Sequence, residues 1–264
     1  ATTNPTSVDA YNLIGNVAIR TGTAENAARW FGVAIRLDNL KTVGPRLNRA
    51  MALEMAGRSE EAFSGYKALH DEHPDHPKIK EKLARSLYER AEHKECLEII
   101  ETIQTLSFDH YYMRGRCRLE LGRAAKAVAD FREALSIRPA YPEAFKGLGQ
   151  GLAQMGRHDD ALSILNPLYA ENPKDPDLTY TLGRIHFDRG DLEQARDFLT
   201  ECLQGTKHEF HANRHLGIIH RRLGSDSDAV PYLSTAIELN PNDYLTFENL
   251  GQALAGLGRL YDLK

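Results

Sequence analysis

The sequence predicts an all-α fold in which helical hairpins stack side by side into a solenoid. The first observation is a small residue that returns every 31 to 35 positions, at Ala27, Ala62, Cys96, Ala127, Ala161, Ala195 and Ala229. The second is a series of glycines spaced 34 residues apart, at Gly115, Gly149, Gly183, Gly217 and Gly251. A period of this length is typical of stacked helical units that bury their core against their neighbours. We therefore expect an array that presents a long surface.

Within each unit the pattern predicts two helices joined by a short turn. In the unit 142–175, Leu148 and Leu152 lie at helical spacing, Gly156 breaks the helix, and Leu165 belongs to a second apolar stripe. The other units repeat this plan, and we expect one solenoid over 8–264. Its boundaries are expected at 8–42, 43–76, 77–107, 108–141, 142–175, 176–209 and 210–243, with an extension at 1–7 and a partial eighth unit at 244–264.

Three further sets of residues mark the ends and the packing of these helices. Glycines are expected in the turns, at Gly22, Gly57, Gly122, Gly156, Gly190, Gly224 and Gly258. Prolines are expected to open first helices, where a missing N–H costs nothing, at Pro77, Pro142 and Pro176. Bulky side chains are expected to fill the space between hairpins, at Phe31, Tyr66, Ile100, Phe131, Leu165, Leu199 and Leu233. The unit 77–107 loses both glycines, to Ala84 and Ala91, and should be the least regular.

These motifs resemble the tetratricopeptide repeat (TPR) family over nearly the whole chain. The Leu-Gly motif of the first helix occurs at Leu148-Gly149, Leu182-Gly183, Leu216-Gly217 and Leu250-Gly251. The second-helix motif of Ala, an aromatic residue, Ala and Pro occurs at Ala127, Phe131, Ala134 and Pro139. The resemblance implies a right-handed solenoid whose first helices line a groove that binds a partner peptide.

Helical phase identifies the residues expected in that groove, because the stripe rotated away from the packing stripe must face it. These residues are Asn12, Asn16, Asn48, Lys78, Lys82, Arg85, Tyr112, Arg116, Lys146, Gln150, Tyr180, Arg184, His211, Arg214 and His215. Six central positions are basic and one acid, Glu81, opposes them, so we expect an acidic partner peptide held by arginine forks and tyrosine faces. Asp109, Glu143 and Asp177 are interpreted as first-turn acids favoured by the helix dipole. The alternative interpretation is an ordinary solvated face.

The start of this stripe also resembles the two-carboxylate clamp of TPR domains that capture chaperone C-terminal tails. The matching positions are Asn12, Asn16, Asn48, Lys78 and Lys82. Asn16, Asn48 and Lys78 agree with the clamp, whereas Asn12 departs from it and Lys82 conserves only the charge. Loss of the first lysine weakens the expected grip on a terminal carboxylate.

Composition excludes several classes of function. A net charge of −4, from 33 basic and 37 acidic residues, argues against a general nucleic-acid binder. No apolar run is long enough to span a membrane. The three cysteines, Cys96, Cys117 and Cys202, form no disulfide framework and read as small apolar side chains. A soluble protein in a reducing, cytoplasmic compartment is expected.

No motif points to catalysis, and we expect no catalytic residue, metal or cofactor. The glycines at 147, 149 and 151 lie within a predicted helix with no strand before it, so a phosphate-binding loop is not expected. His70, His73 and His76 read as a solvated turn, with metal binding as the alternative. His208, His211 and His215 read as a surface that can hydrogen-bond a peptide, again with a metal as the alternative.

Two classes of function follow from this sequence. The first is a non-catalytic scaffold that binds a partner peptide in its groove. The second is a substrate-presenting segment of a larger transferase, of the glycosyl- or sulfotransferase type, whose catalytic domain lies beyond Lys264. Self-association through the ends of the array, with Leu257 and Leu260 exposed, is a third expectation.

Overall fold

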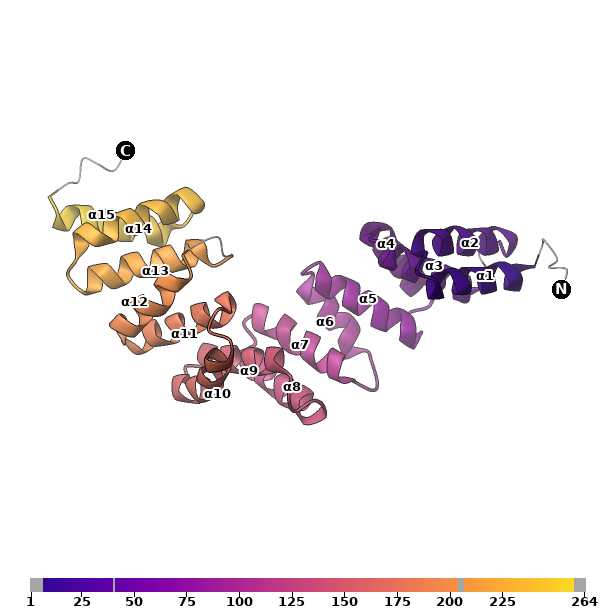
Figure 1. The fold of residues 1–264 in the computed structure, drawn as a ribbon, viewed down its shortest axis with the longest axis horizontal. Helices are drawn as coiled ribbons and strands as arrows, with labels where there is room; N and C mark the ends of the chain where they lie inside the picture. The colour runs from indigo at the N-terminus through magenta and orange to yellow at the C-terminus, as the bar shows by residue number, and fades with distance from the viewer. Residues whose placement is uncertain (1–6, 40, 204–206, 259–264) are drawn as a thin grey trace. The chain divides into compact units, whose positions relative to one another are not determined.

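The described part of the chain is helical throughout (Figure 1). A computed structural model describes residues 7–39, 41–203 and 207–258. These residues form fifteen helices and no strand, which confirms the predicted all-α class. They fall into two compact units, residues 1–123 and 124–264. The expected extension at 1–7 lies outside the described residues except for Ser7.

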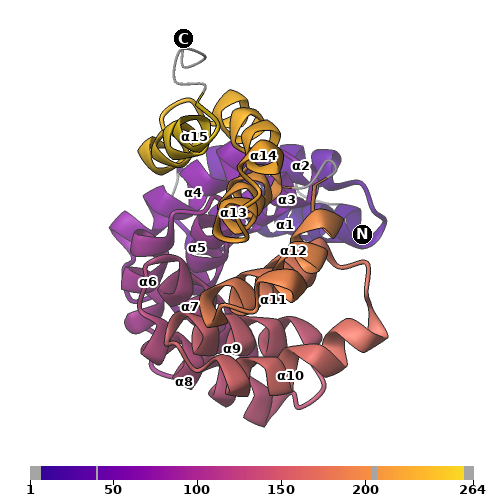
Figure 2. The same ribbon diagram turned by 90° about the vertical axis from the view of Figure 1, so that its left-hand side faces the viewer.

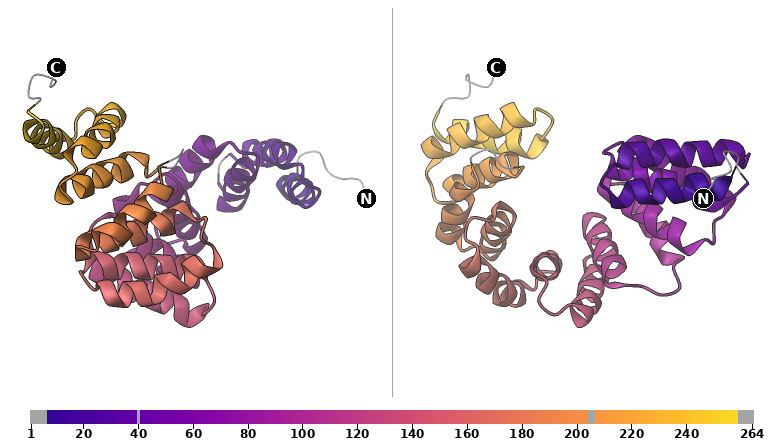
Figure 3. Two further views of the ribbon diagram at one scale, coloured as in Figure 1. Left: turned by 60° about the vertical axis from the view of Figure 1, so that its left-hand side comes forward. Right: turned by 45° about the vertical axis from the view of Figure 1, so that its right-hand side comes forward.

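The first unit contains seven helices, each of which contacts the next along the chain (Figure 3). Within this unit α5 also contacts α7, so first helices of successive hairpins are neighbours. The helices are α1 (Val8–Arg20), α2 (Ala24–Leu37), α3 (Val43–Met55), α4 (Ser59–Glu72), α5 (Pro77–Glu89), α6 (His93–Glu101) and α7 (Phe108–Glu120).

The second unit contains eight helices with the same serial packing (Figure 2). In addition α9 contacts α11, α11 contacts α13, and α13 contacts α15, so these four helices form a continuous row. The helices are α8 (Ala124–Ile137), α9 (Pro142–Gln154), α10 (His158–Glu171), α11 (Pro176–Arg189), α12 (Leu192–Glu201), α13 (Glu209–Arg222), α14 (Asp226–Leu239) and α15 (Tyr244–Gly256). The predicted unit boundaries and the single solenoid over 8–264 stay predictions.

The periodic small residues lie at buried helix crossings. All seven, from Ala27 to Ala229, are at most 2% exposed. A side chain of this size allows two helices to approach closely, and a larger one at such a site would overpack the crossing. The bulky residues four positions later are equally buried, at 1% or less. The three cysteines are buried thiols.

The bulky residues pack against glycines, and mostly inside their own hairpin. A Cβ atom added at Gly149 would lie 2.5 Å from Leu165 Cγ, and one added at Gly183 would lie 2.8 Å from Leu199 Cγ. Gly149 and Leu165 belong to α9 and α10 of one hairpin, so the expectation that these side chains fill the space between hairpins was incomplete. Phe131 on α8 does reach the next hairpin, because its ring covers Gly147 on α9.

The turns between helices use the left-handed backbone region. All seven predicted turn glycines have φ between +70° and +86°, which glycine adopts without steric cost. In the hairpin of α5 and α6 the same position is Ala91, with φ +58°. The turn geometry is therefore kept where the glycine is lost, and the alanine carries the strain.

Proline and aspartate fix the starts of the first helices. Pro77, Pro142 and Pro176 stand in the first turns of α5, α9 and α11, as predicted. Asp175 Oδ1 accepts hydrogen bonds from the backbone N–H groups of Asp177 and Leu178, at 3.0 and 3.1 Å. Asp243 caps α15 in the same way, where Oδ2 accepts from Thr246 N at 3.0 Å. Each cap satisfies N–H groups that have no partner within the helix.

None of the described helices combines the length and the apolar character needed to cross a bilayer. Leu257 at the end of α15 is 37% exposed, and Leu260 lies outside the described residues. Self-association through this end stays a prediction.

Candidate partner-binding groove

In the first unit, the asparagines and lysines of the predicted groove are partly engaged with one another. Asn48 Nδ2 on α3 donates to Asn12 Oδ1 on α1 at 3.2 Å. Lys82 Nζ on α5 lies 3.2 Å from Glu54 Oε2, which also accepts the hydroxyl of Tyr66 at 2.6 Å. Asn16 and Lys78 are exposed. The chaperone-tail clamp is therefore poorly supported, because a carboxylate already occupies Lys82.

Further along the first unit, the groove arginines also face acids. Arg85 Nη2 on α5 lies 3.4 Å from Asp109 Oδ2 on α7. Arg116 lies 3.4 Å from Glu120 on its own helix. The ring of Tyr112 stacks on Phe108, with ring centroids 6.1 Å apart. Asp109 thus pairs with a basic residue of the neighbouring first helix. The helix dipole alone therefore does not account for an acid at this position.

In the second unit, Lys146 on α9 is held by two carboxylates. Its Nζ lies 2.8 Å from Asp175 Oδ2 and 2.8 Å from Glu143 Oε1. Burial alone would lower the pKa of Lys146, but the hydrogen bonds to these two acids outweigh it and raise that pKa. Gln150, one turn later, donates to Thr181 Oγ1 on α11 at 3.3 Å. This end of the row of first helices is therefore closed by internal contacts.

An aromatic cluster forms around Tyr180 on α11. The His208 ring stacks on Tyr180 with centroids 4.3 Å apart and planes 5° apart. His211 and His215 of α13 each place their ring centroid 6.2 Å from Tyr180. Asp177 Oδ1 lies 2.6 Å from His208 Nε2, and Asp177 Oδ2 lies 2.8 Å from Lys207 Nζ. The sequence favoured a surface that can hydrogen-bond a peptide, with a metal as the alternative, and the structure gathers the three histidines around Tyr180.

His211 and His215 of α13 are partly or wholly buried, and burial favours their uncharged form. Burial lowers the pKa of His215 to about 4, and its Nδ1 lies 2.6 Å from the carbonyl oxygen of His211. Burial, reinforced by the nearby charge of Arg214, also lowers the pKa of His211. His211 Nδ1 is buried and has no hydrogen-bond partner among the described residues.

Arg184 and Arg214 differ in how their charge is compensated. Arg214 Nη1 lies 3.2 Å from Asp243 Oδ1, and its guanidinium stands 5.4 Å from the centre of the Phe210 ring. Within the described residues, Arg184 has no carboxylate within 4.0 Å, and its buried Nε lacks an acceptor. Arg214 Nε is likewise buried without an acceptor, so the two arginines differ in the carboxylate beside Arg214.

A hollow of about 350 Å³ lies beside Arg214 and His215 and reaches α15. Arg222 stands 4.6 Å from the centre of the Phe187 ring, and Arg221 Nη1 donates to Asn249 Oδ1 at 2.7 Å. Helical phase also places Ile218 on this face, and one further turn from Arg184 reaches Phe187. The remaining lining was not predicted as part of the groove and consists of Arg221, Arg222, Leu245, Glu248, Asn249 and Gln252.

Neither histidine group forms a metal site in the described part of the chain. No three His, Cys, Asp or Glu side chains there come together closely enough to hold an ion. His70 lies in the last turn of α4, and only His73 and His76 lie in the segment that joins α4 to α5, so the predicted turn was partly wrong.

Models of the tetratricopeptide repeat match this chain in three places. One matches residues 118–168 and 152–204, and a second matches residues 46–76. The chain belongs to the tetratricopeptide repeat family. This TPR chain is also similar to several curated proteins. It is 31% identical over 149 residues to human tetratricopeptide repeat protein 6, an alignment that covers 54% of the chain and 28% of that protein.

The chain is also similar to two curated proteins whose names do not mention the repeat. Superkiller protein 3 of Schizosaccharomyces pombe is 32% identical over 94 residues, covering 36% of the TPR chain and 7% of that protein. BBSome complex member BBS4 of Xenopus tropicalis is 24% identical over 161 residues, covering 59% of the chain and 31% of that protein. The chain therefore spans less than a third of the length of these relatives.

Solved structures confirm the solenoid fold. A tetratricopeptide repeat protein from Parabacteroides merdae is 18% identical with a TM-score of 0.63, and the match covers 94% of this TPR chain and 98% of that one. The Cut9–Hcn1 hetero-tetramer of the APC/C is 15% identical with a TM-score of 0.66, covering 95% of this chain and 50% of that one. At these identities the likeness establishes the fold.

Proposed function

We propose that this TPR chain is a non-catalytic scaffold that binds an acidic partner peptide along the first helices of its second unit. TPR proteins are general protein-interaction scaffolds, and the row of α11, α13 and α15 offers a continuous surface for an extended segment. The observation that carries the proposal is Arg184. Its guanidinium has no carboxylate among the described residues and lies beside the Tyr180 cluster, so a ligand carboxylate supplies the missing partner.

The basic residues predicted for the groove differ in whether an acid of the chain already pairs with them. Lys82, Arg85 and Lys146 already face acids within 2.8 to 3.4 Å, so a ligand carboxylate must compete with an internal one there. Arg184 meets no such competition, and Arg214 is shared with Asp243. The peptide is therefore held between α11 and α13 of the second unit.

Binding of a fluorescein-labelled peptide of alternating glutamate and leucine tests this proposal. We expect Arg184→Glu to weaken binding at least tenfold, about 1.4 kcal/mol, because it places an acid where the ligand carboxylate binds. Arg196→Glu is the matched control, since Arg196 lies on α12 and is paired with Asp197. Fluorescence anisotropy gives both affinities. Equal loss in the two variants, or none in Arg184→Glu, would refute the assignment.

Salt provides a second measurement on the unmodified chain. Exposed charge–charge attraction is screened as ionic strength rises. The affinity for the acidic peptide should therefore fall between 50 mM and 500 mM sodium chloride, and a lysine–leucine peptide should bind poorly at both. An affinity that does not change with salt would show that arginine charge does not hold the peptide.

A second candidate, that the repeats present substrate to a catalytic domain of a longer parent chain, has one observation in its favour. Human and mouse aspartyl/asparaginyl beta-hydroxylase are 24% and 23% identical to this chain over 83% of its length, whereas it spans 26% and 27% of theirs. Sequencing the parent gene on both sides of residues 1–264 tests this candidate. A neighbouring catalytic domain supports it, and stop codons without such a domain exclude it.

A further inference from the structure

Two adjoining hollows lie on the first unit, away from the groove. One, of about 270 Å³, lies between α2 and α3, and the other, of about 140 Å³, lies between α2, α3 and α4. They share Arg49 and Leu53. The first is rich in arginine, and its lining consists of Ala28, Arg29, Gly32, Val33, Arg36, Arg49, Leu53 and Arg58.

Two guanidinium groups converge over Gly32 in the first hollow. A Cβ atom added at Gly32 would lie 3.7 Å from Arg49 Nε and 3.8 Å from Arg36 Nη1. Both arginines therefore border the small volume left open by the missing side chain. Among the described residues, neither Arg36 nor Arg49 has a carboxylate within 4.0 Å. Two like charges so close to each other favour an anion between them.

The acids near this hollow are committed to other arginines. Glu25 lies 2.9 Å from Arg58 and 3.9 Å from Arg29, and Glu61 lies 2.5 Å from Arg58. The outer arginines are thus neutralised, whereas the two inner charges are not. A doubly charged oxyanion matches two arginine forks in both charge and hydrogen-bond geometry.

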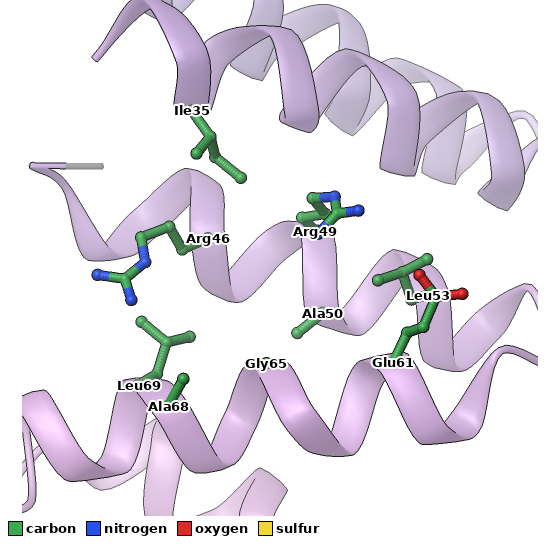
Figure 4. Close-up of a pocket in the computed structure, with 9 residues that line it drawn as sticks. All are labelled: Ile35, Arg46, Arg49, Ala50, Leu53, Glu61, Gly65, Ala68 and Leu69. Carbon is green, nitrogen blue, oxygen red and sulfur yellow. The ribbon is translucent and has the colours of Figure 1, made fainter. Parts of the chain in front are cut away.

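The second hollow is mainly apolar and opens beside Arg49 (Figure 4). Its walls carry Ile35, Leu53 and Leu69, and small residues leave the space between them open. Arg46 borders it, but Glu72 accepts both ends of that guanidinium at 2.5 and 2.6 Å. An apolar side chain therefore fits this hollow directly next to the anion-binding arginines.

This surface is separate from the groove because it uses another face of α3. Residues of a helix advance by about 100° each, so Arg46, Arg49 and Leu53 form one stripe while Asn48 points away from it. Asn48 is the residue that bonds Asn12 in the predicted groove. A ligand at Arg49 and a peptide at Asn48 would consequently occupy different sides of the same helix.

We propose that the first unit binds a phosphorylated peptide, with its phosphate monoester between Arg36 and Arg49 and an adjacent apolar side chain in the hollow of Ile35, Leu53 and Leu69. The phosphate supplies the two negative charges that the protein lacks at this point. The apolar neighbour supplies burial in the second hollow. Together the two hollows recognise a phosphorylated residue and the apolar residue beside it.

Fluorescence anisotropy with the intact chain tests the site, using a labelled peptide that carries phosphoserine followed by leucine. We expect binding to fall at least tenfold when the phosphate is absent, and also in Arg36→Ala/Arg49→Ala. The apolar hollow is tested by replacing the leucine with serine, which should weaken binding severalfold. Arg20→Ala, at the end of α1, is the matched control and should bind as the unmodified chain does.

Gly32→Asp gives a test that does not depend on removing a side chain. Its carboxylate would enter the volume between Arg36 and Arg49, so we expect it to abolish phosphopeptide binding while raising the unfolding temperature. Arg49→Lys should bind more weakly than the unmodified chain but better than Arg49→Ala, because lysine keeps the charge and loses the fork.

Three outcomes would overturn the proposal: equal binding of the phosphorylated and unphosphorylated peptides, full binding by the double arginine variant, or inorganic phosphate competing as strongly as the peptide. The last would assign the site to free phosphate. Arg184→Glu separates this site from the groove of the second unit. It should leave phosphopeptide binding unchanged, and a loss there would place the phosphate in the groove instead.

Discussion

The hairpin of α5 and α6 and the hairpin of α13 and α14 build the same motif with different residues. In the first, Ala84 stands at the crossing and Ala91 in the turn, whereas the second has Gly217 and Gly224. Leu233 covers Gly217 so closely that a methyl group has no room. Ala84 is also fully buried, and its carbonyl oxygen accepts the Cys96 thiol at 3.3 Å. Glycine is therefore required at position 217 beneath Leu233, whereas the crossing of α5 and α6 holds a methyl group.

The largest expected effect is a loss of stability at acidic pH that originates in the hairpin of α13 and α14. The folded-state pKa of His215 on α13 is about 4, below its ordinary value of 6.5, because the side chain is buried. Above pH 6.5 both the folded and the unfolded chains hold it neutral. As the pH falls from 6.5 towards 4 only the unfolded chain gains the proton, so stability falls by about 2–3 kcal/mol.

Chemical denaturation at pH 7 and pH 4.5 measures this effect. In His215→Gln the loss between the two pH values should be smaller by that amount, although carboxylate titration continues in both proteins. An identical pH dependence in the variant and the unmodified chain would show that His215 can be protonated in place.

The next effect concerns the crossing glycine. Gly217→Ala should lower the free energy of unfolding by about 1–2 kcal/mol, because the overlap with Leu233 outweighs the better helix propensity of alanine. A Cβ atom there would lie 2.6 Å from Leu233 Cδ2. Gly44→Ala on α3 is the control, since no neighbour lies within 4 Å of its added methyl group. That variant should be more stable, and a stabilised Gly217→Ala would mean that Leu233 moves freely.

The smallest effect concerns the turns. Ala91→Gly should stabilise the chain by about 0.5–1 kcal/mol, because Ala91 holds φ at +58° and glycine reaches that region without strain. The reverse change, Gly224→Ala, should destabilise it by a similar amount, although open space surrounds Gly224. Thermal unfolding of both variants gives the comparison. A destabilised Ala91→Gly would show that chain entropy in the unfolded state dominates.

Much of the fold could be predicted because the repeats are local in sequence. The turn glycines, the opening prolines and the buried small residues follow from spacing alone. The groove was harder to predict. Tyr180 and Arg184 lie one turn apart on α11, as helical phase requires, but one of the two carboxylates that hold Lys146 comes from Asp175, 29 residues away. Such a contact depends on how far neighbouring helices slide past each other, which periodicity does not specify.

The same reason explains the acids that were misread. Asp177 sits in a first turn, as a helix-dipole interpretation requires, yet it binds Lys207 and His208 immediately before α13. The Arg36 and Arg49 pair was missed because the two residues lie on helices of different hairpins and belong to no repeated motif.

Asp175 and Asp243 each divide their two oxygen atoms between two tasks. One oxygen starts the helix that follows, and the other holds a cation of the first helix before it, Lys146 in one case and Arg214 in the other. Asp243 thus joins Arg214 to the beginning of α15, and Asp175 joins Lys146 to the beginning of α11, so a single carboxylate connects each of these first helices to the next one.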